Sequence, residues 1–431
     1  MRRGMISSLV TLTVLGTAVS AQAQEVTSMT LDEVVQRALL TSPQIAQAAG
    51  NVQTSATAER TSMGQFLPNL NVSSGATLAS TNRFDPNLGT TISGSSDSYS
   101  AGISTSLDLF TGGRRGADLA RSRAQTSAAE AALIEQRYAV TRNAKAGYYD
   151  VLRATDVIRS AEARLARAEQ VLEAAERRSQ VGSGTRSDLL RSQLEVNNAR
   201  QALLQAQNQK RNAMFNLGRV VGVDGPVDAA HEQPLEPAEL PLTREELLEL
   251  VMAASPAVVT AQASEVAASA SVRSARSQYL PNLSSSGSYN WANDEPSFND
   301  VRGSWSMRLS MSFPVFNRFQ REETIERAQV QASLARIQLD DARRFARVNL
   351  ERVLGALETA AQQIALAEQA LEVAMEDSRV QEERYRLGVS TILEQVTSQE
   401  NIVAAEAALI AARYDYQLAR AELEALIGRD L

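Results

Sequence analysis

Four segments of the chain alternate polar and apolar residues with a period of two. The clearest runs from Trp305 to Phe313, where large apolar side chains take the odd positions and serine or arginine the even ones. Such alternation is typical of a β-strand with one apolar and one polar face. The pattern predicts four strands, at about 69–79, 98–110, 282–292 and 303–314.

Two long segments have the period of a helix instead. Neither 114–181 nor 317–386 contains a proline, and apolar or small residues recur in both at steps of three and four. At about 1.5 Å per residue, each helix would reach about 100 Å. Because one chain of this length offers no core of that size, we expect each long helix to pack along other helices, as in a coiled coil.

Shorter helices are expected to complete that packing. The return helices, at 186–217 and 391–427, are about half as long as the long ones. Two further helices, at about 43–66 and 256–279, each begin with a Ser-Pro pair, which suits a first helical turn. Two short helices stacked end to end would match one long helix and form the wall of a cylinder.

The chain also repeats itself. The motif Gln-aromatic-Leu-Pro-Asn-Leu occurs at 65–70 and again at 278–283, an offset of 213, and beyond the strands the offset becomes 206. Self-similarity over such a distance indicates a duplicated structural unit. We therefore expect two repeats, 24–219 and 242–431, joined by an extended linker at 220–241 that carries four prolines.

Two architectures explain strands with one apolar face. In a soluble sandwich that face is the core, whereas in an outer-membrane barrel it meets lipid and the polar face lines a wet lumen. The barrel is favoured because the strands run about ten residues and Tyr289, Trp291 and Trp305 lie near strand ends, as in an interfacial girdle. Four strands cannot close a barrel, and an open edge in lipid leaves backbone groups unsatisfied. Several copies must contribute, and three would supply twelve strands.

Composition rules out most enzyme chemistry. The 431 residues include no cysteine and one histidine, His231, which removes disulfides, thiolate nucleophiles and Cys/His zinc sites. We predict no enzymatic activity, metal or cofactor. The segment from Gly182 to Thr185 superficially suggests a phosphate loop, but it lacks lysine and follows a helix instead of a strand.

The N-terminus has the features of an export signal. Arg2 and Arg3 precede an apolar stretch, and Ala21-Gln22-Ala23 fits a signal-peptidase site, so we expect residues 1–23 to be removed. With no cysteine present, lipid attachment at the cleavage site is not expected, and no later stretch has 18 consecutive apolar residues that would predict a membrane-spanning helix. The net charge of −7 would become about −9 on cleavage, which makes nucleic acid a poor partner.

Taken together, these features resemble the TolC-like outer-membrane efflux proteins, the outer membrane factors. The resemblance spans the mature chain and rests on the duplicated Ser-Pro and Leu-Pro-Asn-Leu motifs, on Leu-Asp-Leu-Phe-Thr-Gly-Gly at 107–113, and on a glycine followed six residues later by an acid at each helical turn. It implies an α+β membrane protein that forms a homotrimer. Its twelve-stranded β-barrel would lie in the lipid of a Gram-negative outer membrane and continue into an α-helical periplasmic tunnel.

The resemblance also implies a function and its partners. The trimer would be the passive exit duct of a tripartite efflux or type I secretion system, driven by an inner-membrane pump or secretion ATPase through a periplasmic adaptor. The turns between long and return helices would lie farthest from the barrel and match the adaptor-contacting tips of the family. These tips are Val181, Gly182, Ser183, Gly184 and Thr185 in the first repeat, and Leu387, Gly388, Val389, Ser390 and Thr391 in the second.

A gate is implied just beyond the tips. Asp188 and Glu394 match family acids at the periplasmic constriction, the first in a polar link to a tyrosine and the second in a cation-binding ring. Tyr385 matches that tyrosine, whereas Ser390 replaces the family's arginine partner, which leaves Arg186 as a local substitute. The alternative is that both are ordinary first-turn acids, since the helix dipole favours carboxylates in a first turn.

Two other protein classes remain open. A periplasmic adaptor would have long helical hairpins, but it should also show a lipoyl-like domain and no duplication of the whole chain. A coiled-coil scaffold outside the membrane would leave the apolar stripe at 305–313 unexplained. Membrane fractionation would separate both from the channel.

Overall fold

The computed structural model describes residues 27–85, 89–182, 184–230, 241–294, 302–429 and 431. The segment predicted to be a signal peptide and His231 lie outside the described residues. The helices are α1 (Leu31–Thr41), α2 (Pro43–Gly64), α3 (Arg114–Gln180), α4 (Arg186–Val221), α5 (Arg244–Ala254), α6 (Pro256–Arg276), the short 3-10 helix η1 (Ser277–Tyr279), α7 (Gln320–Arg386) and α8 (Ile392–Ile427). The strands are β1 (Thr27–Met29), β2 (Asn69–Asp85), β3 (Thr90–Phe110), β4 (Val227–Ala229), β5 (Asn282–Asn293) and β6 (Arg302–Ser312).

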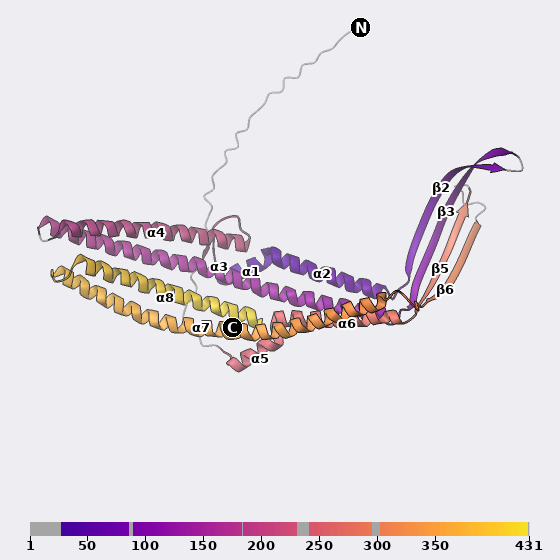
Figure 1. Ribbon diagram of the computed structural model, residues 1–431. Helices are drawn as coiled ribbons and strands as arrows, with labels where there is room; N and C mark the ends of the chain where they lie inside the picture. The colour runs from indigo at the N-terminus through magenta and orange to yellow at the C-terminus, as the bar shows by residue number, and fades with distance from the viewer. Residues whose placement is uncertain (1–26, 86–88, 183, 231–240, 295–301, 430) are drawn as a thin grey trace, which may run out of the picture.

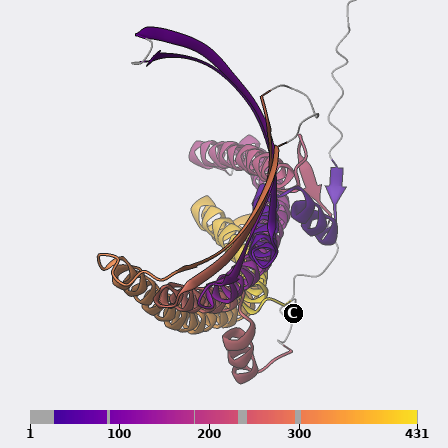
Figure 2. The same ribbon diagram turned by 90° about the vertical axis from the view of Figure 1, so that its right-hand side faces the viewer.

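The helices form one elongated layer with the long strands at one end (Figure 1). α2 and α4 both contact α3 along one side, while α6 and α8 lie between α3 and α7. The end-to-end stacking of short helices beside long ones is therefore confirmed. Viewed along the long axis, the helices and the sheet follow the same curve (Figure 2). One chain thus forms a curved segment of wall, and α7 and the α2/α4 pair are its two lateral borders.

One helical stretch is apolar enough to cross a membrane by length and composition. It runs from Arg244 to Tyr279, and its most apolar window is only 28% buried in the chain. The expectation that no such stretch exists was therefore too strict, because it required uninterrupted apolar residues. In the structure this stretch is divided at Pro256, where α5 ends and α6 begins, and α6 packs between α3 and α7. These contacts make it part of the helical layer.

The four long strands form one antiparallel sheet in the order β2-β3-β5-β6. All four predicted strands are confirmed, but β2 and β3 extend farther than predicted, from Asn69 to Asp85 and from Thr90 to Phe110. The added residues are rich in serine, threonine and asparagine and lack an apolar alternation. They are strand because they pair with each other, up to Asp85 opposite Thr90. β6 ends at Ser312, two residues before the predicted end, because Pro314 cannot donate a ladder hydrogen bond.

A left-handed turn precedes each long helix. In the first repeat it is formed by Gly112 and Gly113, with φ of 62° and 82°. In the second repeat the equivalent residues are Arg318 and Phe319, with φ of 57° and 63°. Side chains with a Cβ rarely adopt this conformation, so the second turn carries local strain. The turn also explains why α7 begins at Gln320 and not at the predicted residue 317.

The predicted linker at 220–241 needs correction in its first part. Its first two residues belong to α4, which ends at Val221 with Gly222 in the left-handed C-cap conformation, φ 70°. Val227–Ala229 then forms β4, which pairs in parallel with β1 near the N-terminus. Three-residue strands are too short for the sequence alternation to reveal, and the pairing is set by packing against α3. Residues 231–240 lie outside the described residues.

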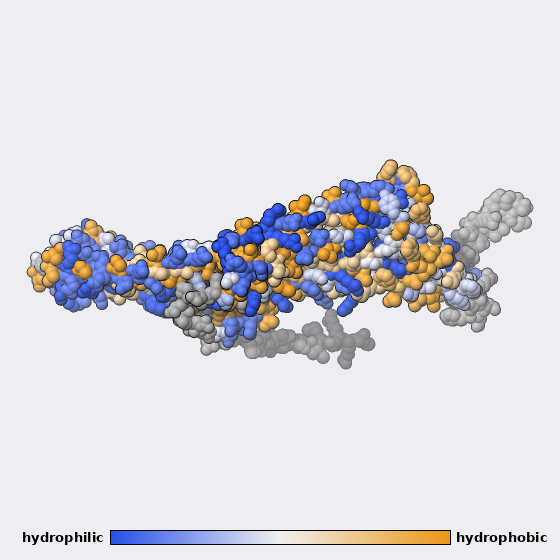
Figure 3. Space-filling model, turned by 90° about the horizontal axis from the view of Figure 1, so that it is seen from below, coloured by the Kyte–Doolittle hydropathy of each residue, from blue (hydrophilic) through white to orange (hydrophobic). Residues whose placement is uncertain are grey.

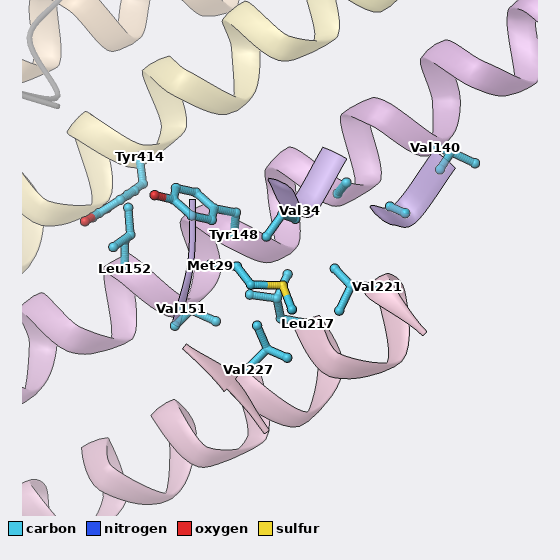
Figure 4. Close-up of a cluster of buried hydrophobic side chains, with 12 residues drawn as sticks. Met29, Val34, Val140, Tyr148, Val151, Leu152, Leu217, Val221, Val227 and Tyr414 are labelled. Carbon is cyan, nitrogen blue, oxygen red and sulfur yellow. The ribbon is translucent and has the colours of Figure 1, made fainter. Parts of the chain in front are cut away.

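The principal core lies at the middle of α3 (Figure 4). Here α1, β1, β4 and the end of α4 cover the long helix, and Val34, Val151, Leu217, Val221 and Val227 are all fully buried. Burial of side chains of this size stabilises the fold by about 1.5 to 3 kcal/mol each. This core fastens the short elements to α3 and leaves both ends of the layer free for other contacts.

Candidate functional site

One face of the sheet is largely apolar. Ladder pairing places Val72, Ile103, Tyr289 and Trp305 in one row across the four strands, so their side chains share a face. Trp305 is 77% exposed and Leu309, on the same face, is 65% exposed. Apolar residues gather at the strand end of the molecule in Figure 3. An exposed apolar surface of this extent needs a partner, and a lipid bilayer matches its chemistry.

The structure brings the three predicted girdle residues together. Tyr289 lies directly opposite Trp305, and Trp291 lies two residues further along the same face, opposite Gly303. A Cβ at Gly303 would come within 2.7 Å of the Tyr289 hydroxyl, so glycine makes room for that ring. The cluster lies at the end of β5 and β6 distant from the helices, where an aromatic girdle would meet a membrane–water boundary.

The opposite face of the sheet is polar. Ser288 and Ser306 lie opposite each other with their hydroxyls hydrogen-bonded at 3.0 Å. The Asn69 side-chain oxygen accepts from the Ser106 backbone at 2.6 Å and from its hydroxyl at 2.9 Å. Short polar side chains paired with each other, with a few charged residues such as Arg308 among them, form a hydrated surface. Such a surface suits the lining of an aqueous channel.

The two helical tips lie together at the end of the layer farthest from the strands (Figure 1). Both turns have the same construction: Gly182 has φ of 74° and Gly388 has φ of 76°, and each follows the last turn of a long helix. Val181, Leu387 and Val389 are exposed. Ser183 lies outside the described residues. The tips therefore offer small residues at the turn and apolar side chains beside it.

Both predicted gate acids cap their helices. Asp188 and Thr185 form a reciprocal capping box at the start of α4, with backbone-to-side-chain distances of 3.1 and 3.2 Å. Glu394 and Thr391 form the same motif at the start of α8, at 3.1 and 3.3 Å. The Ser390 hydroxyl also donates to Glu394. Capping is thus one role of these carboxylates, and both lie in the first turn of their helices.

Tyr385 joins the two repeats at the tip, and its partner is an arginine that the sequence reasoning missed. Tyr385 is 6% exposed and packs against Val171 of α3 and Ile392 of α8. Arg178, near the end of α3, donates from Nη1 to the Tyr385 carbonyl at 2.7 Å. Its guanidinium carbon also lies 4.6 Å from the centre of the Tyr385 ring. This contact ties the first hairpin to the second within one chain.

Arg186 and Asp188 are placed differently from the expectation. Arg186 is exposed at the first position of α4 and forms no ion pair or hydrogen bond with another described residue. Nor does any hydrogen bond in the described part of the chain link Asp188 to Tyr385. The negative charge of Asp188 nevertheless raises the pKa of the Tyr385 hydroxyl. The signal that could have revealed Arg178 is its repeat equivalent: Arg384 lies 206 residues on, and each arginine stands four residues before its turn glycine.

Electrostatics at the tip keep the tyrosine neutral and the glutamate charged. Burial raises the pKa of the Tyr385 hydroxyl above 10.0, an effect opposed by Arg178 and reinforced by Asp188. The Ser390 hydroxyl, the Thr391 backbone and the Arg384 charge lower the pKa of Glu394 below 4.5. Glu394 is therefore a carboxylate at every pH above its ordinary titration range.

The fold and these surfaces define an outer-membrane channel protein with a helical extension into the periplasm. The family model described as "Outer membrane efflux protein" matches residues 34–223 and 247–429, and the chain belongs to this family. It is a family of channels, whose members work with adaptor and inner-membrane pump partners. The protein is thus an outer-membrane efflux channel with a periplasmic helical tunnel.

Relatives and solved structures agree with this assignment. The chain is 28% identical over 409 residues to the pyoverdine export outer membrane protein OpmQ of Pseudomonas aeruginosa, covering 92% of this chain and 83% of OpmQ. It is 25% identical to the outer membrane protein TolC of Vibrio cholerae, covering 96% and 93%. The fold matches CusC with a TM-score of 0.83 at 19% identity, covering 93% and 92%. It matches VceC from Vibrio cholerae with a TM-score of 0.79 at 17% identity, covering 93% and 96%.

Proposed function

We propose that three copies of this chain close a twelve-stranded barrel and a continuous helical tunnel, through which solutes pass outward passively. The observation that carries this proposal is the sheet itself. Its border strands, β2 and β6, each lack a neighbour on their outer side among the described strands, and they carry exposed apolar side chains such as Val72 and Trp305. Unpaired strand borders are not tolerated in lipid, so neighbouring copies must supply the missing partners.

The helical layer supports the same assembly. Its two lateral borders carry exposed apolar side chains: Leu194 and Leu204 on α4, and Phe345, Val348 and Leu366 on α7. Because the borders differ from each other, they would meet head to tail around a rotation axis, which closes a ring. A trimer that resists mild detergent at room temperature and dissociates on heating is expected in outer-membrane fractions. Recovery of only monomer from native membranes would contradict the proposal.

The duct itself would do no chemistry. The polar strand face presents hydroxyl and amide groups, which let hydrated solutes pass without holding them. The energy for export would come from an inner-membrane pump or secretion ATPase, transmitted through a periplasmic adaptor that docks at the helical tips. A closed state needs contacts that hold the tips together, and Tyr385 with Arg178 supplies one.

Removing that contact should open the gate. Arg178→Ala deletes a charge-assisted hydrogen bond and a ring contact, which together contribute about 2 kcal/mol. A shift of that size changes an open–closed equilibrium about 30-fold. We expect a higher resting conductance of the variant in planar bilayers. Arg177→Ala is the matched control, because Arg177 is an exposed neighbour that pairs only with Glu173 of its own helix among the described residues. Equal resting conductance in the two variants would argue against the gate.

Glu394 should make the constriction cation-preferring. Threefold symmetry would place three carboxylates around the pore, where they favour cations and bind multivalent ones. Glu394→Gln removes the charge yet retains an N3 side chain that can complete the capping box. We expect it to reduce cation preference and multivalent block in bilayer recordings. Unchanged ion selectivity in the variant would mean that Glu394 only caps its helix.

A further inference from the structure

An arginine in the first turn of α3 connects three segments at the junction of sheet and helices. Arg115 donates from Nη1 to the Gln65 carbonyl at the end of α2, at 3.1 Å, and from Nη2 to the Leu109 carbonyl in β3, at 3.3 Å. Its guanidinium carbon lies 4.7 Å from the centre of the Phe66 ring. One side chain therefore ties the segment entering the sheet to the segment leaving it.

The second repeat contains a related arrangement. Arg321, in the first turn of α7, donates to the Pro314 carbonyl at 3.0 Å and to the Val315 carbonyl at 3.3 Å, both just after β6. Its guanidinium carbon lies 4.6 Å from the centre of the Tyr279 ring, which precedes β5. Arg321 is only 8% exposed. In both arginines the Nε atom is buried and has no partner among the described residues.

The two arrangements correspond at the arginine, at one carbonyl acceptor and at the aromatic ring, whereas the acceptors Gln65 and Pro314 are not at equivalent positions. Arg115 and Arg321 are 206 positions apart, as are the acceptors Leu109 and Val315, and the aromatic rings at 66 and 279 are 213 apart. The same offsets relate the two repeats as a whole: 213 before the strands and 206 after them. The chain passes between helices and sheet four times. Each arginine connects a segment that enters the sheet to a segment that leaves it.

We propose that Arg115 and Arg321 are positioning residues that fix the direction in which the sheet leaves the helical layer. A barrel and a tunnel form one duct only if every strand continues its helix at the same angle. A planar guanidinium can stack on a ring and donate to two carbonyls at once, whereas a lysine ammonium cannot do both in this geometry. In the trimer of the proposed function, six such contacts would surround the junction.

The test measures the angle within one chain. Because the chain has no cysteine, Ser306→Cys on β6 and Glu326→Cys on α7 introduce a single pair of spin labels. Labelled chains are diluted with unlabelled ones before assembly, so that pulsed dipolar spectroscopy reports the distance inside one protomer. Arg321→Lys is expected to widen the distance distribution at least twofold while the trimer still forms. Arg318→Lys is the matched control, because Arg318 is an exposed arginine at the same junction, and it should leave the width unchanged.

A second variant tests the proposal if Arg321→Lys fails to assemble. Tyr279→Leu keeps the guanidinium and both carbonyl acceptors and removes the ring together with the hydroxyl that donates to Glu322, so a smaller widening is expected. An unchanged width in Arg321→Lys overturns the proposal. If Arg321→Lys does not assemble, an unchanged width in Tyr279→Leu overturns it instead. A wild-type chain that forms no trimer would refute the proposed assembly, whereas the distance within one chain would still report on the junction.

Discussion

Arginine in place of Leu309 is expected to prevent stable insertion of the barrel. Leu309 lies on the apolar face, four residues from Trp305, which is about 13 Å along the strand at about 3.3 Å per residue. The apolar band of such a barrel is ~25 Å tall, so a residue about 13 Å from the aromatic girdle lies near the bilayer midplane. The cost is about 2 to 4 kcal/mol in each protomer, and symmetry repeats it three times in the proposed trimer. Urea-titrated folding into lipid vesicles measures it directly.

The neighbouring position provides the control. Ser310 is opposite Ser284 on the polar face, two residues from Arg308, which already carries a charge there. Ser310→Arg should therefore fold and insert like the wild type. If Leu309→Arg and Ser310→Arg lose the same stability, the assignment of lipid and lumen faces is wrong.

A bulky side chain at the second helical tip is expected to abolish export in cells. Val389 is 65% exposed in a turn held by Gly388, and close approach of an adaptor hairpin requires a small side chain there. Val389→Trp would obstruct the centre of that contact. Truncating or blocking a central interface residue costs about 2 kcal/mol or more, which weakens binding about 30-fold. Export assays and adaptor crosslinking with the purified trimer would both report the loss.

The trimer itself should be unaffected by that substitution. Leu40→Trp is the control, since Leu40 is 86% exposed at the end of α1, far from the tips along the layer (Figure 1). It should retain export. If adaptor crosslinks map to residues 220–230 and persist in Val389→Trp, the tips are not the docking surface.

The sequence predicted the large elements because their signals extend over many residues. α3 and α7 each contain 67 residues without a proline, which predicted two long helices. The strict alternation at 305–313 predicted β6. The duplication predicted that both halves share one architecture. Short elements were missed for the opposite reason: β1 and β4 contain three residues each, and their pairing depends on the core against α3.

The contacts of the site were harder to predict than its location. The two helical turns, with Asp188 and Glu394 just beyond them, lie at the end of the long helices distant from the strands, because a glycine marks each turn; their roles in docking and gating stay predictions. Arg178 was missed because its partner, Tyr385, is 207 residues away in the sequence. Arg115 and Arg321 were missed in the same way, although their repeat offset was present in the sequence. Charged residues on a helix surface have many potential partners, and only the packing of elements distant in sequence selects between them.

Closure between copies can be measured with paired cysteines on the two border strands. One cysteine is placed on β2, at Asn69, Asn71 or Ser73, and one on β6, at Ser304, Ser306, Arg308 or Ser310, in a chain that has no other cysteine. Within one chain these strands are three positions apart in the sheet, about 14 Å at about 4.8 Å per strand, too far for a disulfide. After mild oxidation in native membranes, at least one pair should give a ladder of one, two and three linked chains and nothing larger on a denaturing gel. A ladder that ends at two, extends beyond three or is absent for every pair would contradict a barrel closed by three copies.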